Sequence, residues 1–159
     1  MPVLRRALLA FLLLTALPAW AETLTGCVVA IADGDTLTLL TPDRRQVKVR
    51  LHGIDTPEAR QPFGNRARQA LADMAFQKPA RVEVQETDRY GRTVGRVYVG
   101  AVDVNAELVR QGMAWVYVRY NRDPALPVLE AEARATRRGL WADPRPVPPW
   151  DWRRQQRRN

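Results

Sequence analysis

Two short acidic segments contain the residues best suited to chemistry. Residues 33–36 read Asp-Gly-Asp-Thr, and residues 55–58 read Asp-Thr-Pro-Glu. The first segment lies at a predicted turn between two strands, and the second follows a predicted strand end. Two carboxylates and a backbone carbonyl form the oxygen-rich environment that Ca²⁺ or Mg²⁺ prefers. Taken alone, each segment is equally typical of a solvated turn or a helix cap.

Two arginines extend this pattern toward phosphate chemistry. Arg50 precedes Asp55 at the end of a predicted strand, and Arg92 lies in a tight turn between two later strands. A guanidinium presents a planar fork that matches phosphate oxygens. Cleavage of a phosphodiester requires positive charge on the phosphate, a base that positions water, and groups that hold the substrate. Each arginine alone is more often a solvated charge, but the combination favours phosphodiester cleavage.

The composition excludes several other kinds of hydrolytic site. The chain has 159 residues, the size of one domain, a formal net charge of +8 and 46% hydrophobic residues, enough for a packed core. It has a single histidine, His52, and a single cysteine, Cys27. Zinc sites built on paired histidines or several cysteines are therefore excluded, as is an internal disulfide. Cys27 lies beside two valines, and we expect it to be a small buried core residue.

Four segments in order along the chain resemble the staphylococcal nuclease (thermonuclease) family. They are Asp-Gly-Asp-Thr at 33–36, the run from Arg50 through Asp-Thr-Pro-Glu at 50–58, Asp-Arg-Tyr-Gly-Arg at 88–92 and Leu-Val-Arg-Gln-Gly at 108–112. The resemblance extends from about residue 28 to residue 141. It implies an OB-fold, calcium-dependent phosphodiesterase that acts on DNA and RNA and leaves 3′-phosphates.

The resemblance also implies a metal site. Asp35 and Asp55 match the carboxylates that hold Ca²⁺, and Thr56 matches the residue that offers its backbone carbonyl. Asp33 matches a nearby acid that is usually not a direct ligand.

Three further residues match the catalytic positions of the family. Glu58 corresponds to the general base that acts on the attacking water, a role that is debated within the family. Arg50 and Arg92 correspond to the arginines that bind the scissile phosphate and stabilise its transition state.

The nucleotide pocket of the family matches less completely. Tyr90 and Tyr120 correspond to pocket tyrosines, whereas another expected tyrosine position falls on Val118, with Tyr117 one residue away. The segment after Glu58 is also shorter than in the type member. These departures concern the stacking of bases, not the metal or the catalytic residues.

Two other functions compete with an enzyme. An OB barrel can hold nucleic acid or a protein without cutting, and an exported interaction protein could act through a Trp- and Arg-rich tail. Family members that only bind usually lose site residues, and here all six matched metal and catalytic positions are intact, which favours the enzyme.

The hydrophobic pattern predicts a barrel of strands with helices. Strands are predicted over 25–32, 36–41, 46–52, 81–87 and 94–99, with a β-like stretch over 114–120. Helices are predicted over 65–77, from a cap at Asp103 through Arg110, and from Asp123 to Gly139. This order suits an α+β protein, a five-stranded Greek-key OB-fold barrel with about three helices.

The ends of the chain differ in character from its middle. Residues 1–21 combine two arginines, an apolar run and a small-residue cleavage site, the layout of a signal peptide. We therefore expect an exported protein, periplasmic or extracellular, with no membrane contact in its mature form and a monomeric state. Residues 22–143 form the predicted nuclease domain, and residues 144–159 a Pro/Trp/Arg-rich tail.

The tail ends in a basic cluster after two tryptophans. Trp150 and Trp152 are expected to pack onto the barrel. The arginines that follow, at 153, 154, 157 and 158, lie outside every matched motif. They are expected to aid non-specific DNA binding rather than chemistry, the alternative being a frayed terminus that contacts nothing.

Overall fold

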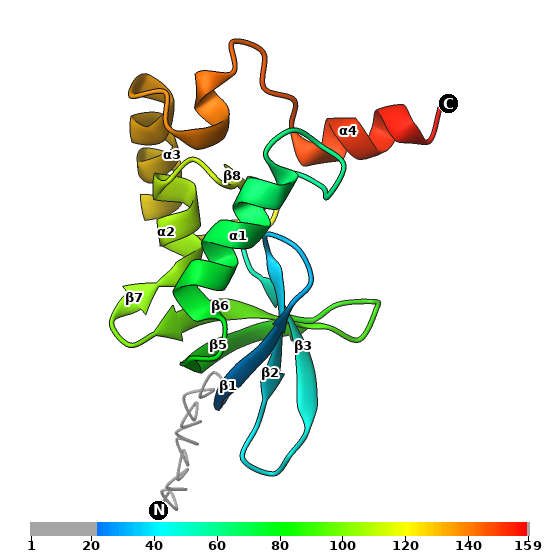
Figure 1. Cartoon of the computed structure of the whole chain (residues 1–159), viewed down its shortest axis with the longest axis vertical. Coiled ribbons are helices and arrows are strands. Elements are labelled where there is room, and N and C mark those ends of the chain that lie inside the picture. The colour runs from blue at the N-terminus through cyan, green and yellow to red at the C-terminus, as the bar shows by residue number, and fades with distance from the viewer. Residues whose placement is uncertain (1–21, 159) are drawn as a thin grey trace, which may run out of the picture.

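The computed structural model describes residues 22–158, so the predicted signal peptide lies outside the described residues (Figure 1). The strands are β1 (Thr23–Ile31), β2 (Thr36–Leu40), β3 (Gln46–Leu51), β4 (Ile54–Asp55), β5 (Pro79–Thr87), β6 (Thr93–Val99), β7 (Val102–Asp103) and β8 (Trp115–Val116). The helices are α1 (Gly64–Ala75), α2 (Val104–Arg110), α3 (Ala125–Ala135), a 3₁₀ turn (Gly139–Ala142) and α4 (Pro149–Gln156). Within residues 22–158, no helix is long and apolar enough to cross a membrane.

Five of the strands close into a barrel. Antiparallel pairs join β3 to β2, β2 to β1, β1 to β5 and β5 to β6, and a parallel pairing of β3 with β6 closes the ring. The short strands β4 and β8 pair beside it, across the end of β3. The predicted five-stranded OB-fold barrel is therefore confirmed. The parallel pairing sets the last residues of β3, Arg50 among them, beside the first residues of β6, which directly follow Arg92.

The barrel strands follow the period-2 pattern of the sequence. In β3, Val49 and Leu51 are buried, while Lys48 points to solvent and Arg50 is half-buried. Alternate residues of a strand lie on opposite faces, so the apolar set fills the core and Arg50 emerges on the other face. Arg50, one residue before the end of β3, therefore lies outside the core, at the mouth of the barrel.

Cys27 departs from its predicted burial. It is exposed on β1, whereas its neighbour Val28 is completely buried. Because successive strand residues alternate between faces, a core position at Val28 requires Cys27 to point outward. The apolar neighbours in the sequence were a poor guide to which face each residue occupies.

The helices cover one side of the barrel (Figure 1). Helix α1 falls within the range predicted for it, 65–77, apart from its first residue, and buries Ala67, Leu71 and Ala75 at helical spacing. Asp103 caps α2, its carboxylate accepting a hydrogen bond from the Ala106 backbone N–H at 3.1 Å. Helix α3 ends at Ala135, earlier than its predicted end at Gly139, because Arg137 adopts a left-handed conformation with φ 50°.

The tail forms a helix rather than a frayed terminus. Helix α4 has Pro149 in its first turn, where a missing N–H costs nothing. Trp150 stacks on Tyr117 with ring centroids 5.3 Å apart and lies edge-on to Trp115 at 5.8 Å. The Gln61 side chain donates a hydrogen bond of 2.6 Å to the Val147 carbonyl just before the helix. These contacts dock α4 beside the loop that precedes α1. They pack Trp150 on β8 and the residue after it, beside the barrel, rather than on the barrel itself as predicted.

Candidate functional site

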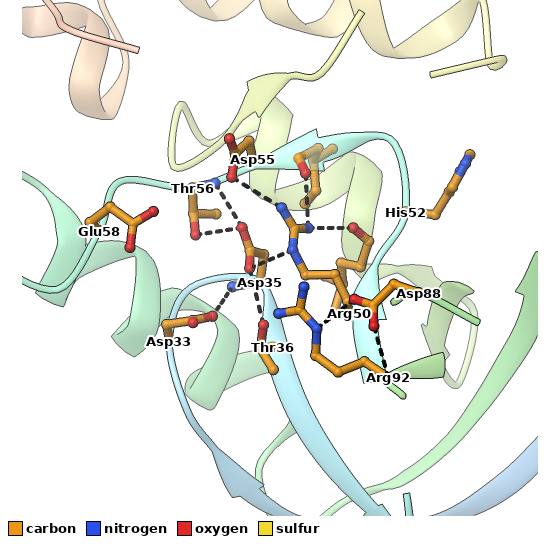
Figure 2. Close-up of polar contacts among 12 residues, drawn as sticks. Asp33, Asp35, Thr36, Arg50, His52, Asp55, Thr56, Glu58, Asp88 and Arg92 are labelled. Atoms are coloured by element: carbon orange, nitrogen blue, oxygen red, sulfur yellow. Dashed lines mark hydrogen bonds and ion pairs between the residues drawn. The ribbon is translucent and has the colours of Figure 1, made fainter. Parts of the chain in front are cut away.

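Asp35 and Asp55 form the buried acidic centre of a cleft at the mouth of the barrel. Asp35 lies in the turn before β2, Asp55 ends β4, and their residues are 5% and 2% exposed. Thr56 ties the two segments together, since its backbone N–H and its hydroxyl donate to Asp35 Oδ2 at 2.8 and 2.9 Å. The structure thus brings the three predicted metal-site residues together (Figure 2).

Arg50 joins the two aspartates. Its Nε lies 3.2 Å from Asp35 Oδ1, and its Nη2 donates to Asp55 Oδ1 at 3.0 Å. Its Nη1 donates both of its hydrogens, to the carbonyl oxygens of Leu51 and Ile54, at 2.7 and 2.9 Å. Figure 2 shows the guanidinium placed between the carboxylates. One Nη2 hydrogen remains for a ligand in the cleft, so Arg50 both assembles the site and faces it.

Glu58 projects from the loop between β4 and α1. Gln61 holds the backbone of Glu58 by two hydrogen bonds. Its side-chain Oε1 accepts from the Glu58 backbone N–H at 3.1 Å, and its backbone N–H donates to the Glu58 carbonyl at 2.8 Å. Gly64 packs so closely that a Cβ at this position would lie 1.9 Å from the Glu58 carbonyl oxygen. The predicted site residue Glu58 is therefore held by local packing, with its carboxylate in the cleft.

Arg92 reaches the same cleft from the turn between β5 and β6. Its Nε pairs with Asp88 Oδ2 at 2.7 Å, and its backbone N–H donates to Asp88 Oδ1 at 3.0 Å. Gly91 allows this tight turn because it adopts φ 78°. Unlike Arg50, Arg92 makes no ion pair with the two central aspartates among the described residues.

The cleft has a volume of about 860 Å³, and all eight predicted site residues line it. Tyr90 and Tyr120 are on its wall, 69% and 42% exposed. Tyr117 also lines the cleft, edge-on to Tyr120 at 4.8 Å, whereas Val118 is 77% exposed and lies outside it. Tyr117 is a lining residue that the matched position in the sequence did not identify.

Arg153 is the largest difference from the predicted site. Its Nη2 contacts Asp55 Oδ2 at 2.7 Å and its Nη1 contacts Glu58 Oε1 at 2.6 Å. Arg153 lies outside every matched motif in the sequence, but the structure places it in contact with two of the predicted site residues. No motif signal could have found it, because 98 residues separate it from Asp55 and α4 must dock first.

Burial and neighbouring charged groups shift the pKa values of Asp55 and Arg153 in opposite directions. Burial raises the pKa of Asp55, and the hydrogen bond from Arg153 partly offsets this. Burial together with the neighbouring Asp35 raises the pKa of Asp33 to about 6. Burial alone would lower the pKa of Arg153, but its hydrogen bonds to Asp55 and Glu58 raise it instead. The hydrogen bond from Arg153 thus favours the charged form of Asp55 against its burial.

The donor set fits a hard divalent cation. Within residues 22–158, no three histidine, cysteine, aspartate or glutamate side chains converge as a metal site. The donors available are the oxygens of Asp35 and Asp55, which line one cleft with Thr56. Ca²⁺ commonly combines a few carboxylates with carbonyls and water, so two buried carboxylates are a suitable set. The described residues that line the cleft include no cysteine and a single imidazole, His52, so their carboxylate oxygens are the donors that suit a hard cation.

An OB-type barrel with arginines and buried carboxylates in one cleft defines a class of protein suited to anionic ligands. Residues 48–143 match the family described as staphylococcal nuclease homologue. The chain is 51% identical to Protein ParB of Escherichia coli, over 96% of this chain and 92% of that protein. It is 44% identical to a micrococcal nuclease of Shigella flexneri, over 95% of this chain and 92% of that protein. It is also 44% identical to an uncharacterized endonuclease of Haemophilus influenzae, over 98% of this chain and 89% of that protein. The chain belongs to the staphylococcal nuclease homologue family.

Proposed function

We propose that this protein is an endonuclease that hydrolyses phosphodiester bonds of DNA and RNA with the help of Ca²⁺. The observation that carries the proposal is the buried Asp35–Arg50–Asp55 cluster, which opens into a cleft also lined by Glu58 and Arg92. The names of the relatives support a nuclease. The arrangement of this chain's own side chains supports the finer assignment of roles.

In the proposed reaction, a water oxygen attacks phosphorus and the bond from phosphorus to the 5′ oxygen breaks. Glu58 takes one proton from the water, and the leaving oxygen takes up a proton from solvent, giving a 3′-phosphate and a 5′-hydroxyl. Arg50 offers its remaining Nη2 hydrogen to the phosphate, and Arg92 reaches the same cleft from the turn that precedes β6. Preorganised positive groups of this kind stabilise the charge that develops in the transition state.

Asp35 and Asp55 would hold the cation, with the carbonyl of Thr56 as a further ligand. When bound, Ca²⁺ would supply a fixed positive charge next to the phosphate oxygens. The tyrosines at 90, 117 and 120 provide aromatic faces along the cleft, on which bases of a single strand can stack. The +8 formal charge of the chain favours the approach of a polyanion.

The test combines both substrates with control of the metal. Purified protein is incubated with DNA and with RNA, each in the presence of Ca²⁺ or of a chelator. We expect cleavage of both substrates with Ca²⁺, 3′-phosphate ends in the products, and no cleavage with chelator. Binding without cleavage under every condition would favour the alternative function, a non-catalytic OB-fold binding module.

Replacing Asp35 by alanine is expected to weaken Ca²⁺ binding and lower activity together. Loss of a metal's outer supporting contacts already costs roughly 10–100-fold in affinity, so loss of a direct ligand should cost at least as much. Titration calorimetry measures the affinity, and a cleavage assay at saturating Ca²⁺ measures the activity. Unchanged calcium affinity in the folded variant would remove Asp35 from the ligand set.

Replacing Gly64 by alanine is expected to displace Glu58. A Cβ would have to share space with the Glu58 carbonyl, so we expect a loss of unfolding free energy of about 1–3 kcal/mol. The kcat should fall, while calcium affinity should stay unchanged because the two aspartates lie on other elements. Urea unfolding and calorimetry make these measurements. Asn65→Ala, at the exposed next position, is the control and should stay within about 0.5 kcal/mol.

We also propose that the protein is exported and acts as a monomer, in the periplasm or outside the cell. The support for export is the charged, apolar and small-residue layout of residues 1–21. A nuclease outside the cytoplasm would meet foreign or released nucleic acid rather than the cell's own genome.

A further inference from the structure

Arg153 forms ion pairs with two of the carboxylates on which the proposed chemistry depends. Its guanidinium bridges Asp55, a proposed metal ligand, and Glu58, the proposed base, at 2.7 and 2.6 Å. The contact with Asp55 is nearly bidentate, since Nη1 also lies 3.4 Å from Oδ1. With Arg50 already on the other side, both oxygens of Asp55 accept hydrogen bonds from arginines.

The helix that carries Arg153 is fixed at one end only. The end near Trp150 is packed against Tyr117 and Trp115, and Pro149 is buried. Beyond Arg153 the residues of α4 are exposed, through to Arg158. Helix α4 therefore has an anchored start and an exposed end (Figure 1). Arg153 lies between them and lines the cleft.

The positive charge of Arg153 opposes the binding of a divalent cation at Asp55. The cluster of Asp35, Asp55 and Glu58 carries three negative charges, and Arg50 and Arg153 bring two positive ones. Arg153 is 39% exposed, so its charge can move into solvent, whereas the Arg50 side chain is only 15% exposed and is held by four contacts within the protein. A divalent cation that binds Asp55 would lie within a few ångströms of the Arg153 guanidinium and would be repelled by it.

We propose that Arg153 is an internal counter-cation that competes with the divalent metal for Asp55 and restrains Glu58, so that metal binding displaces Arg153 from the cleft. The inference rests on the proposed function, because it takes Asp35 and Asp55 as the metal-binding carboxylates. It assigns to α4 a role in setting metal affinity. The freed guanidinium would then be available on the cleft wall beside Arg157, which lines the same cleft.

Calorimetric titration of the purified protein with Ca²⁺ alone tests the proposal. Arg153→Gln removes the charge and leaves a shorter polar side chain, and we expect the variant to bind Ca²⁺ about ten-fold more tightly than the unmodified protein. Arg153→Lys, which keeps the charge without the fork, should lie in between. The matched control is Arg154→Gln, because among residues 22–158 Arg154 pairs with Asp151 alone and lies outside the cleft. The calcium affinity of this variant should be unchanged.

The outcomes separate this inference from the proposed function. Equal affinities of the unmodified and Arg153→Gln proteins would overturn the competition while leaving the nuclease untouched. Weaker binding by Arg153→Gln would overturn it as well and would make Arg153 a residue that positions Asp55. Calcium binding by neither protein would overturn the proposed metal site and the competition with it, whereas binding by the variant alone would support the proposal strongly. Circular dichroism of each variant establishes that it is folded.

Discussion

Replacing Arg92 by lysine is expected to lower kcat by ~10²–10³-fold, the usual effect of losing one preorganised contact to a transition state. Lysine keeps the positive charge but lacks the planar fork that contacts two phosphate oxygens at once. Arg92 pairs with Asp88 at the surface of a turn, with 30% of its side chain exposed, so the fold does not depend on it. We expect the unfolding free energy and the calcium affinity to stay near those of the unmodified protein.

Cleavage kinetics on an oligonucleotide, urea unfolding and calorimetry measure the three quantities. Arg81→Lys is the matched control, because Arg81 is an exposed arginine that also pairs with a carboxylate, Glu83, but lies outside the cleft. Near-normal turnover in a folded Arg92→Lys protein would show that Arg92 has no part in stabilising the transition state.

Replacing Arg50 by methionine is expected to cost about 3–5 kcal/mol of unfolding free energy at neutral pH, in addition to abolishing cleavage. The substitution leaves the buried carboxylates of Asp35 and Asp55 without the cation between them. It also leaves the carbonyls of Leu51 and Ile54 without their donor.

The stability loss should depend on pH with a defined sign. Burial already raises the pKa of Asp55, and loss of Arg50 would raise that pKa further. A carboxyl whose pKa is raised on folding destabilises the fold above that pKa and ceases to do so as it takes up its proton. The loss should therefore be full at neutral pH and should shrink as the pH falls through the raised pKa of Asp55.

The control for Arg50→Met is Arg96→Met. Arg96 also bridges two aspartates, Asp103 and Asp123, but each of these is 23% exposed and can be solvated when the arginine is lost. We expect a loss of about 1 kcal/mol and unchanged calcium affinity. Equal losses in urea unfolding for the two variants would contradict the view that burial of the Asp35–Asp55 pair makes Arg50 indispensable.

Much of the site could be predicted because its parts are local. Arg50 and Asp55 are five residues apart and make their ion pair within one strand–turn segment. Asp88 and Arg92 form a second local pair in a turn that Gly91 permits. Such motifs combine side chains and backbone geometry within a few residues, and so they can be read from sequence.

Other parts depend on which elements pack together. The sequence places Tyr117 and Val118 side by side, and only the folded turn shows that Tyr117 faces the cleft while Val118 faces solvent. The predicted burial of Cys27 is wrong for a related reason, because the burial of a strand residue depends on which face of the strand the barrel turns inward.

The sequence by itself determined the period-2 strands, the acidic and arginine motifs, and the family to which they belong, because each depends on short-range spacing. The tertiary structure alone decided how separate segments meet. Closure of β3 on β6 sets the strand that follows Arg92 beside Arg50, so that Arg92 lines the same cleft as the two aspartates. Thr56 contacts Asp35 across 21 positions. Docking of Trp150 on Tyr117 brings Arg153 to Asp55 across 98 positions. Contacts at such separations arise from the packing of whole elements, which no local spacing encodes.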